Sequence, residues 1–350
     1  MAARVKRKPA ATVAGRIAHA VTSDPTLPVV VIGAGPCGLA AAASIQQLGI
    51  PVVVFDRGSV ASSIASYPVY MTFFSTADKI AIAGLPFPLA TDKPTRREAL
   101  AYYRQVVTHF GLDVRQYEPV EHVWRRKDEL VVHSRPRGGD LVETRARAVV
   151  VATGYFGSPN PIGVPGEDLP HVSHLYREGH EAFQREAIVV GGGNSAAEAT
   201  LDLWRHGAKV MLVHFGPNFD KNIKPWVLPD LQNRLKDGAI GVRWNTRVTA
   251  IEAGRVHLEG KDGPGILPAQ HVYLMTGFTP STTLLASLGV DVDAVTGVPS
   301  HEPSTMETNV PGVFIAGVLA SGYDANKVFI ENGRGHGVLI ARALGGPAPQ

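Results

Sequence analysis

Cysteine is almost absent from this chain of 350 residues, in which Cys37 is the only one. A single thiol excludes an intramolecular disulfide framework, a C-x-x-C redox pair and a thiolate zinc site. We therefore expect no metal site, and we expect the cytoplasm as the compartment.

Long apolar runs and a strong charge of either sign are also missing. No segment reaches 18 apolar residues without Gly, Pro or Gln, so we expect no membrane span. The basic N-terminus has no apolar stretch behind it, so we expect no secretory signal there, only a disordered or weakly helical extension over residues 1–27. The net charge is +3, but residues 1–28 hold five basic residues and one acid, hence +4, which leaves −1 for the remainder. This balance argues against nucleic acid as the main partner.

A dinucleotide-binding pattern occupies Pro28 to Gly58. An apolar run leads through three glycines with G-x-G-x-x-G spacing into an Ala-rich helical segment, and a second apolar run ends in an acid. In order, these parts are Val29–Ile32, then Gly33, Gly35 and Gly38, then Leu39–Leu48, Val52–Phe55 and Asp56.

Each part of this pattern has a role in binding an adenine dinucleotide. Gly33 makes the tight turn, Gly35 lets the backbone approach a pyrophosphate, and Gly38 lets helix and strand pack closely. The helix N-terminus offers N–H groups and partial positive charge to the phosphates, and Asp56 accepts hydrogen bonds from a ribose. A glycine-rich loop without a nucleotide is the alternative, which the complete order of parts disfavours.

The same pattern recurs 158 residues later, too far for a short solenoid repeat. It reads Ala187–Val190, then Gly191, Gly193 and Ala196 within GGGNSA, a helix to His206, and Val210–Val213. His214 stands where the first unit has Asp56. A carboxylate about 4 Å from a 2′-phosphate costs roughly 4 kcal/mol per charge pair at an effective dielectric constant near 20. The second unit therefore suits NADP(H), and the first suits the ADP half of FAD.

The contacts to the 2′-phosphate are less defined. His214 is one candidate, with Lys221 and Lys224 as helpers. A surface histidine beside solvated lysines is the alternative.

Two linkers organise the chain. Residues 155–166 hold three prolines and three glycines, and Phe278–Ser281 is a second connection. We predict an α/β protein with two Rossmann-like, three-layer ββα domains, in which the NADPH domain (162–275) is inserted into the FAD domain (28–157 and 278–350). A double crossing permits a hinge.

Local signals complete the prediction. Thr95 and Glu98 form a capping box for a helix that Gly111 ends. We expect a strand at Val313–Ala316 and a helix that opens near Asp324 and runs past Arg334. Residues 59–88 are irregular and, at that length, expected to be functional.

Taken together, the motifs resemble the flavoprotein reductases with two dinucleotide domains, and within them the YpdA-type bacillithiol disulfide reductases. The resemblance covers residues 28–343 and rests on GPCG, YPVYMTFFSTADKIAI, ALAYYRQVV, KPWVLP and FIENGRGHG. The wider superfamily commonly has an aspartate where this chain has Val318, and thioredoxin reductases have a C-x-x-C pair where it has Asn194 to Ala197. Both departures agree with the YpdA type.

This resemblance implies that Cys37 is the redox-active thiol. Its place at a helix start favours the thiolate, whereas a nearby phosphate raises the thiol pKa, and the sequence leaves the balance open. A small residue packed under the nucleotide is the alternative. The implied path runs from NADPH to FAD and then to a mixed disulfide between Cys37 and a low-molecular-weight thiol.

Further cofactor contacts are predicted in both halves. Tyr67, Thr72 and Phe73 are candidates to line the isoalloxazine, and Asn326 and Lys327 to face its pyrimidine; packing and capping are the alternatives. Trp226 is either an anchor over the NADPH site or an interface residue. The predicted FAD set is Gly33, Gly35, Pro36, Gly38, Asp56, Arg57, Thr72, Thr153, Gly154, Gly317, Asn326 and Lys327. The predicted NADPH set is Gly191, Gly193, Asn194, Ser195, Ala196, His214, Lys221, Lys224, Thr276 and Gly277.

Three other functions compete with disulfide reduction. A flavin-dependent monooxygenase shares both units, but Leu169–Tyr176 lacks the Phe–Gly start of its F-x-G-x-x-x-H signature. A ferredoxin–NADP reductase of this fold needs no cysteine, and a redox-sensing NADP(H) module would lack flavin. For the preferred function we expect a small-molecule disulfide as substrate and a homo-oligomer, dimer or tetramer.

Overall fold

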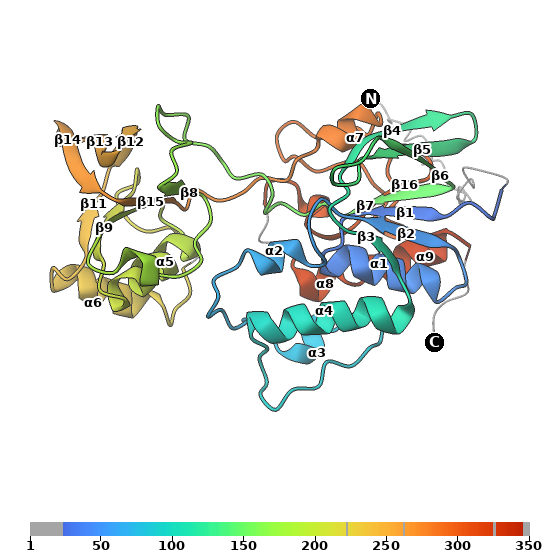
Figure 1. The fold of residues 1–350 in the computed structure, drawn as a ribbon, viewed down its shortest axis with the longest axis horizontal. Coiled ribbons are helices and arrows are strands. Elements are labelled where there is room, and N and C mark those ends of the chain that lie inside the picture. Colours follow the sequence, from blue (N-terminus) through green and yellow to red (C-terminus); the bar gives the residue numbers. More distant parts are fainter. Residues whose placement is uncertain (1–23, 222, 262, 325–326, 346–350) are drawn as a thin grey trace, which may run out of the picture.

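The computed structural model describes residues 24–221, 223–261, 263–324 and 327–345, arranged around two parallel sheets (Figure 1). The predicted N-terminal extension lies almost wholly outside the described residues. No helix in the described part of the chain is long and apolar enough to cross a membrane.

The first sheet has five parallel strands in the order β16-β7-β1-β2-β3. The bounds are β1 Val29–Ile32, β2 Val52–Phe55, β3 Asp113–Arg115, β7 Ala148–Val151 and β16 Val313–Ile315. The central strand β1 is apolar and buried throughout, as a strand covered on both faces must be. In the sequence, β16 follows all the strands of the second sheet, so the second unit is inserted between β7 and β16 of the first.

Helices cover one face of this sheet and a small antiparallel sheet covers the other (Figure 1). The helices are α1 Pro36–Gln46, α4 Arg96–Phe110 and α9 His336–Ala343, and the antiparallel strands are β4 Val120–Arg126, β5 Glu129–Ser134 and β6 Val142–Ala146. α1 and α9 approach closely, since a Cβ added to Gly337 would lie 2.7 Å from the backbone of Ala40. The small residues of the Ala-rich segment thus serve helix packing.

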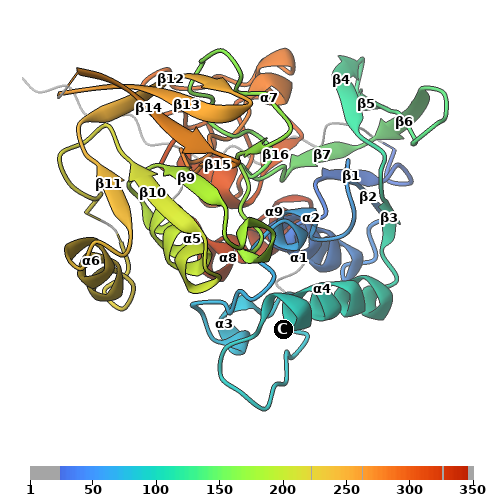
Figure 2. The ribbon, with the colours of Figure 1, turned by 60° about the vertical axis from the view of Figure 1, so that its left-hand side comes forward.

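The second sheet repeats the design in the order β11-β10-β9-β15-β8, also parallel (Figure 2). It lies between α5 and α6 on one side and the antiparallel strands β12, β13 and β14 on the other. The bounds are β8 Val172–Ser173, β9 Glu186–Val190, α5 Asn194–Arg205, β10 Lys209–Val213, α6 Leu228–Lys236, β11 Gly241–Arg243, β12 Thr246–Glu252, β13 Gly254–Gly260, β14 Gly263–Ala269 and β15 His271–Leu274.

The two connections between the sheets are hydrogen-bonded to each other. The Asn160 N–H donates to the Gly277 carbonyl oxygen (3.0 Å), and the Thr279 N–H donates to that of Ser158 (3.0 Å). The Asn160 carboxamide oxygen also accepts from the Thr279 hydroxyl (2.6 Å). The linkers therefore form a short antiparallel ribbon, which ties the two units together.

Most local predictions are confirmed. The predicted strands appear within a residue or two of their expected ends, and Thr95 and Glu98 form the capping box of α4, which Gly111 ends in the left-handed conformation (φ 60°). Short elements occupy the irregular stretch 59–88, namely α2 Ser62–Ala65 and α3 Ala77–Ile80. Thr283–Ser287 forms α7.

The helix predicted from Asp324 past Arg334 is wrong. The chain forms a four-residue helix α8, Ile330–Gly333, and then α9 from His336. The two glycines beside Arg334 weaken a continuous helix at this point, because glycine is a poor helix former.

Replacing Gly38 by alanine should destabilise the fold itself. An added Cβ would lie 1.9 Å from the Gly33 carbonyl oxygen, and both groups are backbone, so neither can yield. We expect a loss of about 3 kcal/mol or more in the free energy of unfolding, measured by urea denaturation. Gly265→Ala on β14, where an added Cβ meets nothing, is the matched control and should stay within about 0.5 kcal/mol of wild type. Equal stability of the two variants would contradict this account.

Candidate active site

A cavity of about 900 Å³ lies between the two units. It is bordered by the carboxyl ends of strands in the first sheet (Ile32, Phe55 and Ala152) and by Asn194 and Met275 of the second unit. Ligands of open parallel sheets bind outside these strand ends, and a volume of this size suits a large cofactor with a substrate.

The first glycine loop is packed against protein at Gly33 and open at Gly35. Gly33 has φ +115°, and a Cβ there would lie 2.4 Å from the Ala152 carbonyl oxygen, so glycine is required. A Cβ added to Gly35, in contrast, meets no protein atom within 4 Å. No side chain caps the N-terminus of α1 and no acid stands in its first turn, so its N–H groups remain available to an anion. These residues fit the pyrophosphate of FAD.

Asp56 organises this loop. Its carboxylate accepts hydrogen bonds from the N–H groups of Ala34 (2.7 Å) and Gly58 (2.7 Å). An ionised carboxylate has about four lone-pair sites, so capacity remains for a ribose hydroxyl. The acid therefore has a structural role that the sequence pattern did not reveal, beside its predicted role in binding.

The other residues of the predicted FAD set divide into two groups. Cavity-lining residues are Pro36, Arg57, Thr153, Gly154 and Gly317, together with Tyr67 and Phe73. Thr72 does not line the cavity; it is exposed, and its backbone bridges to Thr95. Lys327 is likewise exposed and pairs with Asp324 (3.4 Å), while Asn326 lies outside the described residues.

Cys37 stands at the cavity wall beneath two glycines. A Cβ added to Gly333 would lie 2.9 Å from the cysteine Sγ, and one added to Gly317 would lie 3.2 Å from it. Although part of the residue faces the cavity, the surrounding protein removes the thiol from water and raises its pKa to about 12. Burial, rather than the helix N-terminus, therefore dominates the pKa of this thiol.

His336 is a site residue that the motif FIENGRGHG contains but does not single out. Its Nδ1 accepts a hydrogen bond from the Gly317 N–H (3.2 Å), so Nε2 carries the proton. Burial lowers the pKa of the ring, which keeps it neutral. This bond holds the Gly317 backbone against Cys37. The pattern FIENGRGHG contains no signal for such a contact, because the partner is a backbone group from another segment.

The second glycine loop repeats the packing of the first. Gly191 has φ +143°, and a Cβ there would lie 2.4 Å from the Met275 carbonyl oxygen. Asn194, Ser195 and Gly277 line the cavity. The predicted Gly193 and Ala196 belong to the loop and helix start, and the Thr276 hydroxyl donates to the Asn160 carbonyl oxygen in the linker ribbon (2.6 Å).

The structure disfavours His214 as a contact of the 2′-phosphate, and the roles of Lys221 and Lys224 stay predictions. The His214 ring is 3% exposed and so close to Gly192 that a Cβ there would lie 2.3 Å from it. Burial lowers the pKa of His214, so the ring is neutral. Lys224 faces the cavity with its Nζ 4.7 Å from the centre of the Phe74 ring, and Lys221 is exposed.

An acid also lies near this loop. Asp220 Oδ1 is 3.8 Å from His214 Nε2, and its Oδ2 would be 3.5 Å from a Cβ on Gly193. The carboxylate that is absent from the end of β10 is thus present six residues later. The lack of an acid at position 214 is therefore not by itself a sufficient reason for NADP(H) preference.

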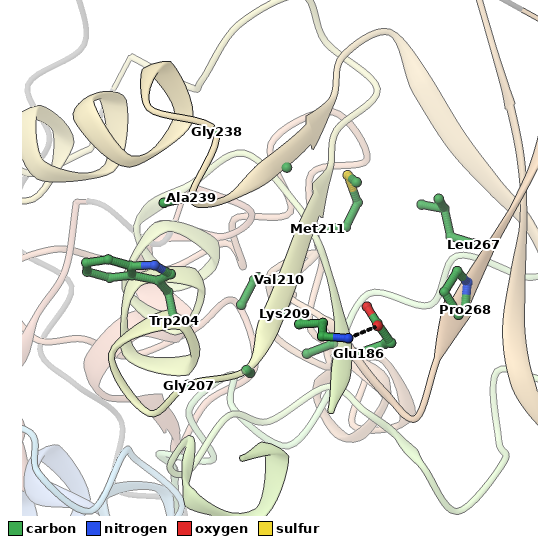
Figure 3. A pocket seen from close by; sticks show the side chains of 13 residues that line it. Glu186, Trp204, Gly207, Lys209, Val210, Met211, Gly238, Ala239, Leu267 and Pro268 are labelled. Carbon is green, nitrogen blue, oxygen red and sulfur yellow. Dashed lines mark hydrogen bonds and ion pairs between the residues drawn. The ribbon is translucent and has the colours of Figure 1, made fainter. Parts of the chain in front are cut away.

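A second cavity, of about 470 Å³, lies at the opposite edge of the second sheet (Figure 3). Glu186, Lys209 and Gly241, which begin β9, β10 and β11, line it together with Trp204, and Lys209 pairs with Glu186 (3.1 Å). Because it faces the amino ends of the strands, it is not a nucleotide site by the general rule for such sheets.

The chain belongs to the pyridine nucleotide-disulphide oxidoreductase family, whose model matches residues 30–317. This assignment, with the fold, confirms an oxidoreductase that uses FAD and NADPH. The chain is 40% identical to bacilliredoxin reductase Bdr of Bacillus subtilis (strain 168) over 321 residues, covering 90% of this chain and 96% of that protein.

Two solved structures agree with this placement. The bacillithiol disulfide reductase Bdr (YpdA) from Bacillus cereus superposes with a TM-score of 0.88 at 39% identity, covering 91% of this chain and 98% of that one. The enzyme of the same name from Staphylococcus aureus gives 0.84 at 36% identity, with the same coverage. The resemblance inferred from the motifs is confirmed. A relative named ferredoxin–NADP reductase, from Ignicoccus hospitalis, is less similar at 28% identity, and a rice relative named indole-3-pyruvate monooxygenase matches about half of the chain.

Gly35→Ala should weaken FAD binding without weakening the fold. The added Cβ enters space that no protein atom occupies, so the stability of the apoprotein should stay within about 1 kcal/mol of wild type. The same methyl group obstructs a pyrophosphate, and we expect FAD affinity to fall at least about tenfold. Flavin titration of the apoprotein and its urea denaturation measure the two effects. An unchanged affinity would place the pyrophosphate elsewhere.

The pH dependence of alkylation tests the environment of Cys37. Thiolate is the reactive form, and with a pKa of about 12 only about one thiol in ten thousand is ionised at pH 8. We expect the rate of modification by iodoacetamide to be still rising at pH 10.5, as followed by mass spectrometry of the holoenzyme. A plateau reached below pH 8 would show instead that the thiolate is stabilised.

Proposed function

We propose that this chain is an NADPH-dependent flavoprotein that reduces a low-molecular-weight disulfide, bacillithiol disulfide or a close analogue. The observation that carries the proposal is the position of the only cysteine in the wall of the interdomain cavity, beside the glycine loop that fits FAD. The two Bdr structures and the B. subtilis relative support the choice of substrate.

In this proposal each unit has one cofactor. Residues 28–157 and 278–350 hold FAD, mainly through Gly35, the N-terminus of α1 and Asp56, and residues 162–275 bind NADPH through the loop at Gly191. When bound, the flavin supplies the two-electron chemistry that links a hydride donor to thiol–disulfide exchange. The protein supplies orientation and a cavity that restricts access of water.

Cys37 forms the covalent link to the substrate in this proposal. Its Sγ bonds to one sulfur of the disulfide while the sulfur–sulfur bond breaks, and the first thiol leaves with a proton. Two electrons originating from NADPH then break the mixed disulfide, which releases the second thiol and restores Cys37. The balance is one NADPH, one proton and one disulfide consumed, and two thiols and NADP⁺ formed.

The alternatives do not use Cys37. Neither oxygenation nor ferredoxin reduction requires a thiol. We further propose that the protein acts in the cytoplasm, as one thiol without a disulfide suggests, and as a homo-oligomer.

Cys37→Ala should separate the two half-reactions. We expect disulfide-dependent NADPH oxidation to fall at least about 100-fold, while NADPH reduces the bound flavin at a rate within about twofold of wild type, followed by stopped-flow absorbance without oxygen. Ser44→Ala, a buried small-residue change on the same helix, is the control and should keep both activities. Full disulfide turnover in Cys37→Ala would refute the role of the thiol.

The substrate is tested by comparing bacillithiol disulfide with the disulfides of glutathione and coenzyme A. We expect kcat/KM to be at least about tenfold higher for bacillithiol disulfide. Equal values would leave a general disulfide reductase, and no turnover with any of the three would overturn the proposed function.

A further inference from the structure

The end of β10 is joined to the β11–β12 turn by backbone hydrogen bonds. The His214 N–H donates to the Arg243 carbonyl oxygen (2.9 Å), and the Thr246 N–H donates to the His214 carbonyl oxygen (3.0 Å). Arg243 and Arg247 stand on either side of this junction. They therefore flank the strand end at which the adenosine ribose of a dinucleotide binds in this type of sheet.

An arginine and an exposed aromatic ring are stacked beside this strand end. Phe215 is 60% exposed, and the guanidinium carbon of Arg247 lies 4.7 Å from the centre of its ring. Among the described residues Arg247 forms no ion pair, whereas Arg255 on the neighbouring strand β13 donates to Glu252 (2.7 Å). Stacking occupies the face of the guanidinium and leaves its N–H edge available for an anion.

His214 and Asp220 do not supply the charge that a 2′-phosphate needs. His214 is buried and neutral, and Asp220 adds a negative charge on the side of Gly193. A phosphate bound here requires a cation that outweighs this acid. Arg247 is oriented for this role by Phe215, since its planar fork matches the geometry of a phosphate.

We propose that Phe215 and Arg247 form the subsite for the 2′-phosphate of NADPH, with Arg247 binding the phosphate and Phe215 holding the guanidinium in place. The inference rests on the proposed function in one respect, the use of NADPH at the second glycine loop. It makes Arg247 the residue that separates NADPH from NADH, in place of the histidine at the strand end.

The test uses 2′,5′-ADP and 5′-AMP as probes, which differ only in the phosphate. Their dissociation constants are measured by isothermal titration calorimetry on the FAD-loaded wild type, Arg247→Ala, Phe215→Ala and the control Arg255→Ala, which removes the same charge from an arginine that has a carboxylate partner. We expect the wild type to prefer 2′,5′-ADP at least about tenfold. Arg247→Ala should lose this preference with 5′-AMP affinity unchanged, Phe215→Ala should lose part of it, and Arg255→Ala should keep it.

Kinetics give a second measure. In Arg247→Ala the KM for NADPH should rise at least about tenfold, the KM for NADH should stay constant, and the rate of flavin reduction at saturating NADPH should be unchanged. An Arg247→Ala variant that retains the wild-type preference for 2′,5′-ADP overturns the inference, as does a wild type without any preference. The binding of these probes involves no disulfide. If the protein prefers 2′,5′-ADP but does not reduce a disulfide, the proposed substrate is wrong and the assignment of Arg247 still holds.

Discussion

The site depends on contact between a glycine and the carbonyl group that follows a neighbouring strand. In the first unit Gly33 packs against the Ala152 carbonyl oxygen, and in the second Gly191 packs against that of Met275. In both, a side chain would enter the space of a backbone group, so the loop can turn tightly only because glycine has none. This turn brings the N-termini of α1 and α5 to the carboxyl edges of the sheets, where both take part in the cavity between the units.

The relative position of the two units has a separate physical origin. Asn160 bonds the two linkers to each other, and a second contact forms where Lys224 of the second unit lies over Phe74 of the first unit. The Phe74 and Trp226 rings are 5.8 Å apart across the same gap. Contacts of this kind are few and partly exposed, in contrast to the buried cores within each unit. These contacts favour one arrangement of the two units, but the units lack the large apolar interface that would prevent them from rotating relative to each other.

The sequence predicts this fold well where the signal is local, and poorly where it is not. Apolar runs, glycine spacing and the Thr95–Glu98 capping box depend on neighbours along the chain, and the structure contains each of them close to its expected position. The predictions for Thr72, Lys327 and His214 rest on position within a pattern, whereas the orientation of these side chains depends on packing that no pattern records. His214 is the clearest case, because two glycines from separate loops leave its ring a buried space. The break between the short helices α8 and α9 is a similar case, because Gly333 and Gly337 pack against Cys37 and Ala40 of α1.

The environment of Cys37 slows both its oxidation and its reaction with disulfides. Tight enclosure raises the pKa of the thiol, so alkylation and peroxide oxidation, which need the thiolate, are slow at neutral pH. Disulfide exchange needs the same thiolate and is therefore slowed as well. The described residues place no cation in contact with the sulfur, and His336 is neutral and turned to Gly317. A group bound in the cavity can increase reactivity only by bringing positive charge or hydrogen-bond donors to the sulfur. Reactivity of the lone cysteine is thus tied to occupation of the cavity, which distinguishes it from an exposed thiol that reacts with any oxidant.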